Sequence, residues 1–183
     1  MGSLTIITGS PGAGKTTLAA HLATFSARGV HICGDVFYSF LAHPIKPTLP
    51  ESLEQNTAVI RATVRSASAF AMADYDVFLE GIFGPWFLPV IAKELQNTGH
   101  SVAYVILRLD LEEAIRRTLA RDRNCDESVI RQMNAAFCNL GEYERYVLPV
   151  GSITTVELSE EFHHRRPHSL LDLDALAGVQ LSE

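Results

Sequence analysis

The sequence lacks several patterns that would place it in a specialised class of protein. It holds three cysteines, Cys33, Cys125 and Cys138, which are far apart and odd in number. Such cysteines form neither a disulfide framework nor a zinc-binding spacing, so we expect a reducing environment. No apolar run approaches the roughly 18 residues of a membrane-spanning helix, and no basic leader precedes an apolar signal segment. We therefore expect a soluble protein of the cytoplasm.

Basic residues are also in the minority. The 183 residues include 15 lysines and arginines against 21 acidic residues, which gives a net charge of −6. A protein that binds nucleic acid through a broad basic surface would carry the opposite excess. Apolar residues make up 47% of the chain and charged residues 20%, an ordinary globular composition. We expect one domain and no nucleic-acid or membrane partner.

One glycine-rich stretch near the start of the chain carries the strongest signal. Gly9–Thr16 reads Gly-Ser-Pro-Gly-Ala-Gly-Lys-Thr and matches G-x-x-x-x-G-K-[ST] at every fixed position. The apolar stretch Ser3–Thr8 before it predicts a buried strand, and Thr16–Phe25 after it predicts a helix. In this context the pattern predicts a P-loop, whose backbone N–H groups bind the phosphates of a nucleoside triphosphate. The residues expected to bind it are Gly9, Ser10, Pro11, Gly12, Ala13, Gly14, Lys15, Thr16 and Thr17.

Three side chains near the phosphates have predicted roles of their own. Lys15 is expected to reach the β- and γ-phosphates, and the Thr16 hydroxyl to ligate Mg²⁺. Glu80 ends the apolar stretch Asp76–Glu80, where a carboxylate can hold the same ion directly or through water. The alternative is an ordinary acid at a strand end, and glutamate in place of the more usual aspartate weakens the case for direct coordination.

Strand and helix patterns alternate along the chain. Strands are expected at Ser3–Thr8, Gly29–Cys33, Asp76–Glu80, Ser101–Leu107 and Gly151–Leu158. Helical patterns fall at residues 16–25, 51–73, 85–97, 111–122, 127–140 and 170–177. This alternation predicts an α/β fold of the P-loop NTPase type, with a five-stranded parallel sheet flanked by helices. Residues 1–183 are expected to form a single domain with a small lid at about residues 117–130.

Four polar features follow or end four different predicted strands: the P-loop, Asp35, Glu80 and Arg108. Ligands of open parallel sheets bind beyond the carboxyl ends of the strands, so we expect these features to face one crevice. Asp35 is the predicted general base, because phosphoryl transfer to an alcohol requires a group that accepts the hydroxyl proton. The alternatives are that Asp35 merely begins a helix after Gly34, or that Glu80 is the base.

Arginines gather on and after the helix predicted at residues 111–122, namely Arg116, Arg117, Arg121 and Arg123. Arg117 and Arg121 are four residues apart and share a helix face, next to the polar segment Asp122–Asp126. Cations stabilise the charge of a transferring phosphoryl group, which favours a functional role for this pair. A solvated helix face paired with acids is the alternative, and it fits Arg116 and Arg123 at least as well.

Together these features resemble the small P-loop kinases. The resemblance rests on Gly9–Thr16, Gly34-Asp35, Leu79-Glu80-Gly81 and the Arg117-x-x-x-Arg121 pair, and it spans most of the chain. The group includes gluconate, shikimate, adenylate and cytidylate kinases, chloramphenicol phosphotransferase and the zeta toxins. The resemblance implies ATP and Mg²⁺ as cofactors. It also implies that Arg117 stacks on adenine or binds phosphate, and that Arg121 is a lid arginine that closes over the transition state.

Other stretches bear on the acceptor. Gly84–Leu88 and Phe137–Glu144 are similar to stretches of uncharacterised bacterial ATP-binding kinase-like proteins. Nucleoside monophosphate kinases grip the acceptor phosphate with two arginines that follow Gly-Asp and Asp-Gly. Here Tyr38 takes the first of these places, and Trp86 follows Pro85 near the second. Arg61 or Arg65 offers a compensating cation.

Aromatic residues near the predicted crevice suggest the wall of a substrate pocket, and the alternative is that they simply pack the core. The residues concerned are Phe37, Tyr38, Phe83 and Trp86. The expected acceptor contacts are Tyr38, Arg61, Phe83 and Trp86.

We therefore expect an ATP-dependent small-molecule kinase that transfers the γ-phosphate to a hydroxyl group, with Lys15, Asp35 and Arg121 in catalysis. One alternative is a nucleoside monophosphate kinase of the cytidylate or adenylate type. The other is an ATP-binding regulatory module without transferase activity. The acceptor's identity and the oligomeric state stay open.

Overall fold

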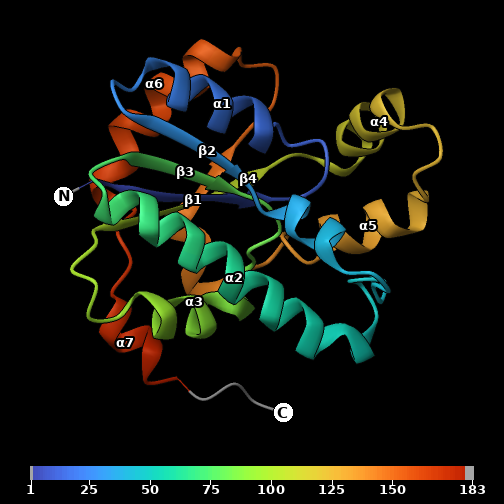
Figure 1. Ribbon diagram of the computed structural model, residues 1–183. Coiled ribbons are helices and arrows are strands. Elements are labelled where there is room, and N and C mark those ends of the chain that lie inside the picture. Colours follow the sequence, from blue (N-terminus) through green and yellow to red (C-terminus); the bar gives the residue numbers. More distant parts are fainter. Residues whose placement is uncertain (1, 180–183) are drawn as a thin grey trace.

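A parallel sheet forms the centre of the computed structural model, which describes residues 2–179 (Figure 1). Its strands are β1 (Leu4–Gly9), β2 (Gly29–Cys33), β3 (Asp76–Glu80), β4 (Val102–Arg108) and β5 (Val147–Pro149). They lie in the order β2-β3-β1-β4-β5, and all neighbouring pairs are parallel. The predicted α/β fold with a five-stranded parallel sheet is confirmed.

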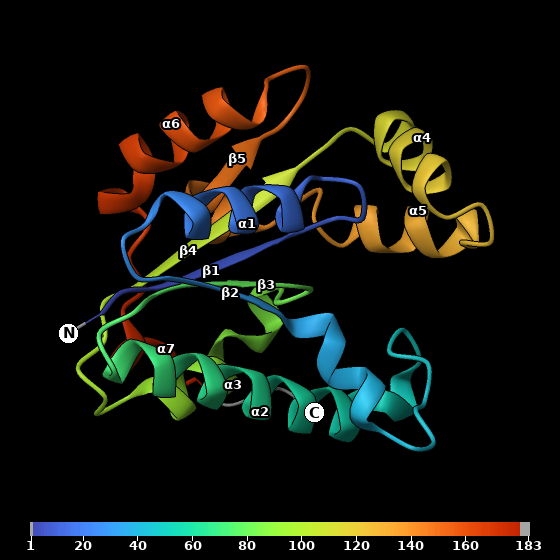
Figure 2. The ribbon, with the colours of Figure 1, turned by 45° about the horizontal axis from the view of Figure 1, so that its top comes forward.

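Helices cover both faces of this sheet. They are α1 (Lys15–Phe25), α2 (Leu53–Met72), α3 (Leu88–Leu95), α4 (Leu111–Arg121), α5 (Glu127–Ala135), α6 (Thr155–Arg165) and α7 (Leu173–Ala177). Figure 2 shows α1 and α6 on one face and α2, α3 and α7 on the other, with α4 and α5 projecting past the carboxyl ends of the strands. Within residues 2–179, none of the helices combines the length and apolar character needed to cross a membrane.

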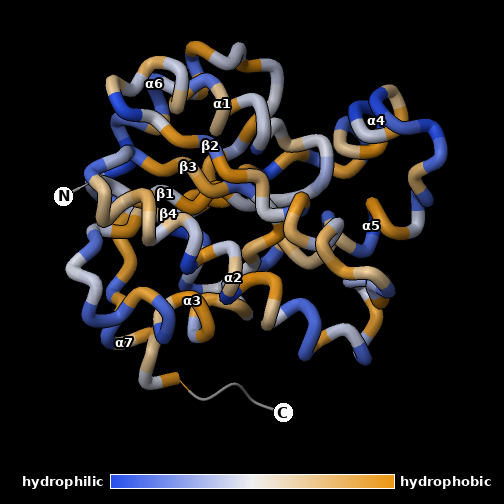
Figure 3. Tube along the Cα trace, viewed as in Figure 1, coloured by the Kyte–Doolittle hydropathy of each residue, from blue (hydrophilic) through white to orange (hydrophobic). Residues whose placement is uncertain are grey.

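The core consists of two apolar layers, one on each face of the sheet. Leu4 and Ile6 of β1 pack in the layer that contains Val64 of α2, whereas Ile7 packs in the layer that contains Leu18 of α1. Successive strand residues point to opposite faces, and both faces are covered, so most residues of the strands are apolar. In Figure 3 the strands are accordingly hydrophobic while much of α4 is hydrophilic.

The fifth strand is not where the sequence pattern predicts it. The expectation of a strand at Gly151–Leu158 is wrong, because the strand that pairs with β4 is β5, and α6 begins within the expected range. The Thr154 side chain accepts from the Glu157 N–H, and the Glu157 carboxylate accepts from the Thr154 N–H. This capping box outweighs the β-branched composition of the segment, because it satisfies N–H groups at the helix start while Phe162 is buried.

The strand order brings the start of the P-loop against β4. Gly9 has a φ of +137°, and a Cβ there would lie 2.0 Å from the Leu107 carbonyl oxygen. Only glycine fits this position, since the two backbones are in contact. The loop therefore leaves the sheet at a defined point, beside the ends of β3 and β4.

Candidate active site

The P-loop joins β1 to α1 and holds a buried lysine. Gly14 is the N-cap of α1 with a φ of +87°, and Lys15 is the first helical residue. The Lys15 ammonium donates to the carbonyls of Gly9 and Ser10, each at 3.0 Å. Burial lowers the pKa of Lys15, while the carboxylates of Glu80 and Asp35 act in the opposite direction. A cation at the helix N-terminus, with few waters around it, is suited to bind a phosphate group.

The tip of the P-loop touches α4. Gly12 has a φ of +75°, and a Cβ there would lie 3.0 Å from the Ala114 carbonyl oxygen and 3.1 Å from the Thr118 hydroxyl oxygen. The contact sets the distance between the loop and the helix that carries Arg117 and Arg121. Glycine at this position therefore serves both the loop conformation and the position of α4.

Gly12→Ala is expected to weaken the binding of an ATP analogue about tenfold. An L-residue in the left-handed region costs roughly 1–2 kcal/mol, and the added methyl group also presses on α4. Isothermal titration calorimetry measures the change. Gly178→Ala is the control, because the nearest atom to a Cβ there is 3.6 Å away. Equal affinities for the two variants would contradict the role given to the contact between the loop and α4.

Glu80 and Thr16 supply oxygen atoms beneath the loop. Glu80 is 1% exposed, and the Thr16 hydroxyl donates to its carboxylate at 3.1 Å. His31 Nε2 lies 3.7 Å from the same carboxylate oxygen. A hydroxyl and a buried carboxylate, placed next to a predicted phosphate site, fit the preference of Mg²⁺ for oxygen ligands. The residues present are therefore compatible with that ion.

His31 and Cys33 also face this carboxylate, and sequence reasoning missed them. They lie two residues apart on β2, hence on one face of the sheet, and Cys33 is in register with Glu80 of β3. Burial, together with the hydrogen bond to Glu80, raises the pKa of the Cys33 thiol to about 11. The thiol thus stays protonated at neutral pH and acts as a donor, not a nucleophile. The sequence signal that could have identified them is the two-residue period of a strand, which places His31 and Cys33 on the same face of β2.

Asp35 lies in the turn after β2, within the 3₁₀ segment Gly34–Phe40. The carboxyl group is open to a cavity, yet the protein around it raises its pKa by desolvation. Lys15 and Arg121 lower that pKa and Glu80 raises it further. Both cations predicted for catalysis therefore act on Asp35. A carboxylate with a raised pKa is a stronger base than an exposed one.

The arginines of α4 separate into two kinds. Arg121 acts on the site electrostatically, since its positive charge lowers the pKa of both Lys15 and Asp35. Arg117 joins α4 to the loop after β5, since its guanidinium bonds Glu113 at 2.6 Å and the Gly151 carbonyl at 2.8 Å. Arg116 instead pairs with Glu113 on an exposed face of the helix.

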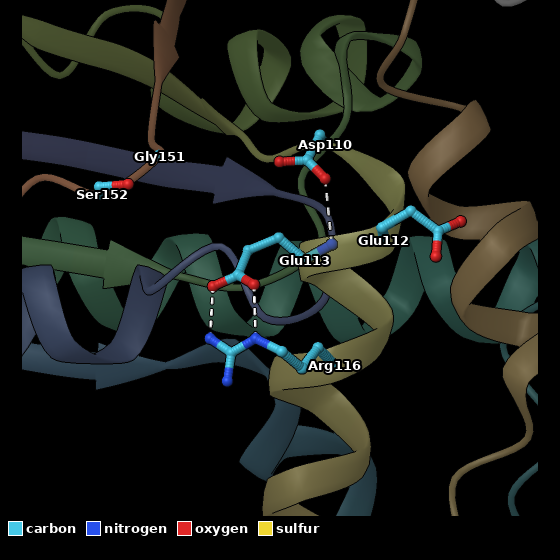
Figure 4. Close-up of a pocket in the computed structure, with 6 residues that line it drawn as sticks. All are labelled: Asp110, Glu112, Glu113, Arg116, Gly151 and Ser152. Carbon is cyan, nitrogen blue, oxygen red and sulfur yellow. Dashed lines mark hydrogen bonds and ion pairs between the residues drawn. The ribbon is translucent and has the colours of Figure 1, made fainter.

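A pocket of about 560 Å³ lies between the start of α4 and the loop after β5 (Figure 4). The carboxylates of Asp110, Glu112 and Glu113 line it together with the Arg116 guanidinium, and Gly151 and Ser152 form the other side. Figure 4 shows Glu113 paired with Arg116, while the Asp110 side chain accepts from the Glu113 N–H. Because three carboxylates outnumber the one guanidinium, the lining disfavours phosphate and suits an uncharged part of a ligand.

Arg108 forms its hydrogen bonds with residues that are not part of the P-loop. Its guanidinium bonds both carboxylate oxygens of Glu144 at 2.8 Å and also donates to the Phe137 carbonyl at 2.7 Å. The expectation that it faces the crevice with the other strand-end residues is therefore not met. Arg108 anchors the segment after α5 to the end of β4.

A second cavity, of about 820 Å³, opens beside Asp35. Tyr38, Phe83 and Trp86 all line it, together with residues of α2, of α5 and of the segment from residue 46 to 53. The backbone of Phe83 is held on two sides, because its N–H donates to Thr8 Oγ1 and its carbonyl accepts from the Tyr104 hydroxyl. The cavity is thus built around a fixed aromatic wall.

Arg61 is not brought to this cavity. Its guanidinium pairs with Glu94 of α3 at 2.6 Å, and Arg65 pairs with the same carboxylate. Phe37 packs against Phe40 and is not among the lining residues. The expected compensating cations therefore bind another helix.

Comparisons with known proteins give a family and a fold. A model described as an AAA domain matches residues 6–135, well over half of the chain. A search of curated proteins finds no significant match.

Solved structures of kinases share the fold. A sugar kinase from a Janibacter species is 18% identical with a TM-score of 0.67, covering 98% of this chain and 100% of that one. The APS kinase of Mycobacterium tuberculosis, solved with AMPPNP and APS, is 16% identical with a TM-score of 0.64, covering 89% and 96%. The shikimate kinase of Acinetobacter baumannii, solved with shikimate, is 18% identical with a TM-score of 0.56, covering 88% and 92%. At such identities the likeness shows the fold alone.

Proposed function

The chain belongs to the AAA domain family, and on that premise we propose that it is an ATP-dependent phosphotransferase acting on a hydroxyl group of a small molecule. One observation carries the proposal. Asp35 is open to a cavity on one side and is influenced by Lys15 and Arg121 on the other. A carboxylate between a phosphate site and a substrate cavity is placed to accept the proton of an attacking alcohol.

The donor half of the proposed site runs from the P-loop to the loop after β5. The triphosphate binds the N–H groups of Gly9–Thr16, and the Lys15 ammonium turns from the loop carbonyls to the β- and γ-phosphates. The acidic pocket beside Gly151 takes the uncharged base, with Arg117 at its edge. Thr16 and Glu80 would hold Mg²⁺, which when bound neutralises charge on the phosphates.

In the transfer step, the alcohol oxygen forms a bond to the γ-phosphorus as the bond from that phosphorus to the bridging oxygen breaks. Asp35 accepts the hydroxyl proton, and ADP leaves with the electrons of the broken bond. Lys15 and Arg121 stabilise the negative charge that spreads over the transferring group. The products are ADP and a phosphate ester, and the proton passes from Asp35 to solvent.

Neither alternative function is favoured by the cavity. Within its described lining, Lys46 is the one cationic side chain, and Arg61 is paired with Glu94. A nucleoside monophosphate kinase needs fixed cations for the acceptor phosphate. A regulatory module would need no base between two sites, and Asp35 occupies that place.

A transfer assay tests the proposal directly. The protein, Mg²⁺ and ATP labelled at the γ-phosphate are incubated with fractions of a hydroxylated metabolite library, and labelled organic products are separated from phosphate. We expect an acid-stable phosphate ester. ATP binding without transfer to any fraction would favour the regulatory alternative. Transfer to nucleoside monophosphates alone would favour the nucleotide kinase.

Arg121→Ala is expected to lower kcat/KM about 100-fold and to move its acid limb to higher pH. Asp35 must be ionised to act as the base, so activity falls as the pH falls through its pKa, which lies above the usual 3.8. Arg121 lowers that pKa, so removing the guanidinium raises it further. The pH profile of kcat/KM measures the shift. Arg131→Ala is the control, because Arg131 pairs with Glu127 on α5 and lines neither pocket, and it should leave the pH profile unchanged. A wild-type pH profile for Arg121→Ala would show that Arg121 does not act on Asp35.

A further inference from the structure

We propose that the acceptor is an uncharged, largely apolar alcohol of drug-like size, and not a polyol, an acid or a phosphate ester. This inference rests on the proposed function, since the alcohol is the group that Asp35 serves. It comes from the chemistry of the cavity wall, which is separate from the phosphate site.

The size and composition of the cavity indicate a ligand of drug-like size with a mostly apolar surface. Its volume of about 820 Å³ lies in the upper part of the range for drug-sized ligands, about 300–1,000 Å³. The cavity is lined from three directions: by Ile60 of α2, by Met133 of α5 with Phe137 just after that helix, and by Phe83 and Trp86 after β3. A ligand that fills this space is surrounded by hydrocarbon and aromatic surface, so most of its own surface must be apolar.

The charges along the wall disfavour an anionic acceptor. Asp35 and Lys46 carry the only full charges in the described lining. A carboxylate or phosphate bound beside Asp35 would meet a like charge there, and Lys46 is the one cationic side chain of the described lining that could offset it. Burying such a charge unpaired is strongly unfavourable.

Three polar side chains of the wall, Tyr38, Asn56 and Ser52, are bonded to one another or to backbone carbonyls, which disfavours a polyol, while Thr48 and Gln132 also line the cavity. The Tyr38 hydroxyl donates to Asn56 Oδ1 at 3.0 Å. Asn56 Nδ2 in turn donates to the Pro47 carbonyl at 2.8 Å and to Ser52 Oγ at 2.9 Å, and Ser52 Oγ donates to the carbonyls of Pro47 and Leu49. Each sugar hydroxyl buried without a partner would cost about 1–3 kcal/mol. A ligand with one hydroxyl, directed at Asp35, avoids this cost.

Exposed apolar side chains at the cavity point to the same class. Leu53 is 61% exposed and Trp86 is 43% exposed, although both line the cavity. An apolar ligand would remove this surface from water, and the affinity it gains rises with the area that it covers.

Trp86 allows a binding test that does not depend on catalysis. It is the single tryptophan of the chain, so its fluorescence reports on the cavity. The probes are 4-cyclohexylcyclohexanol, the matched acid 4-cyclohexylcyclohexanecarboxylate, and myo-inositol as a ring polyol. We expect the alcohol to shift the emission to shorter wavelength and to bind at least about tenfold more tightly than the other two. Equal or tighter binding of the acid or of myo-inositol overturns the inference.

A pair of variants on one helix locates the binding. Leu53→Asp should weaken binding of 4-cyclohexylcyclohexanol about tenfold, because a charge replaces apolar surface at the cavity. Met72→Asp is the control, since Met72 is 68% exposed on α2 and does not line the cavity. ATP affinity should be unchanged in both variants. Wild-type affinity of Leu53→Asp for the alcohol contradicts the proposed site.

The two proposals fail in different ways. If the bound alcohol is never phosphorylated in the presence of ATP and Mg²⁺, and no other acceptor is found, the transferase proposal fails while the ligand class stands. If myo-inositol or an anionic alcohol is phosphorylated and apolar alcohols are not, the ligand class fails while the transferase proposal stands.

Discussion

Asp35→Asn is expected to lose phosphoryl transfer by a factor of about 10²–10⁴ while ATP binding stays within about twofold of the wild type. The amide keeps the shape of the carboxyl group but cannot accept the hydroxyl proton. The carboxylate is not required to bind the nucleotide, because the cations of the donor half lie on the P-loop and α4. The variant therefore separates binding from chemistry.

The fold should tolerate this change. Burial raises the pKa of Asp35 above its usual value, so the ionised carboxylate lowers the stability of the folded state at neutral pH. That loss disappears as the pH falls below the unfolded-state pKa, and the neutral amide avoids it at every pH. We therefore expect the Tm of Asp35→Asn to be equal to that of the wild type or higher.

The measurements are single-turnover transfer, calorimetric titration of an ATP analogue, and thermal unfolding. Asp174→Asn, an exposed acid in α7, is the matched control and should behave as the wild type. Undiminished turnover of Asp35→Asn would remove Asp35 from the mechanism. Glu80→Gln would then test the other acid beside the P-loop as the base.

Lys15→Ala is expected to lose both binding and transfer. The ammonium makes charge-assisted contacts worth about 1.5–3 kcal/mol to the phosphates, so affinity for ATP should fall roughly 10- to 100-fold. Loss of a cation at the transferring group should cost a further factor of about 10²–10³ in the transfer rate at saturating ATP. Titration calorimetry and single-turnover assays measure the two effects separately.

The signature of Lys15→Ala differs from that of Asp35→Asn in the binding step. Lys93→Ala, on α3, is a control for removing one lysine elsewhere. Wild-type ATP affinity of Lys15→Ala would show that the triphosphate does not bind as proposed, whatever its effect on transfer.

Local patterns were sufficient to predict the strand-to-helix turn that we propose binds the phosphates. The P-loop is one contiguous stretch, Gly9–Thr16, so its glycines and its lysine lie within a single strand-to-helix turn. Asp35 and Glu80 were found because parallel strands end at one edge of the sheet, so position along the chain predicted position in space. The same reasoning failed for Arg108, since an arginine can reach several partners and this one binds Glu144.

Strand propensity gave a wrong prediction at Gly151–Leu158, where a short helix-capping motif favours a helix instead. The run Ile153–Val156 is β-branched and favours a strand, whereas the Thr154–Glu157 capping box and burial of one face favour α6. The real strand, β5, is only Val147–Pro149, too short to show a period of its own.

The sequence by itself determined the fold class, the P-loop and the acids at the strand ends, because these depend on neighbours in the chain and on strand direction. Only the tertiary structure decided which residues line the proposed acceptor cavity. This cavity combines residues from Gly34 to Phe137, and the pairing of Arg61 with Glu94 and of Tyr38 with Asn56 depends on which helices meet. Side-chain partners between distant segments follow from packing, which no local pattern encodes.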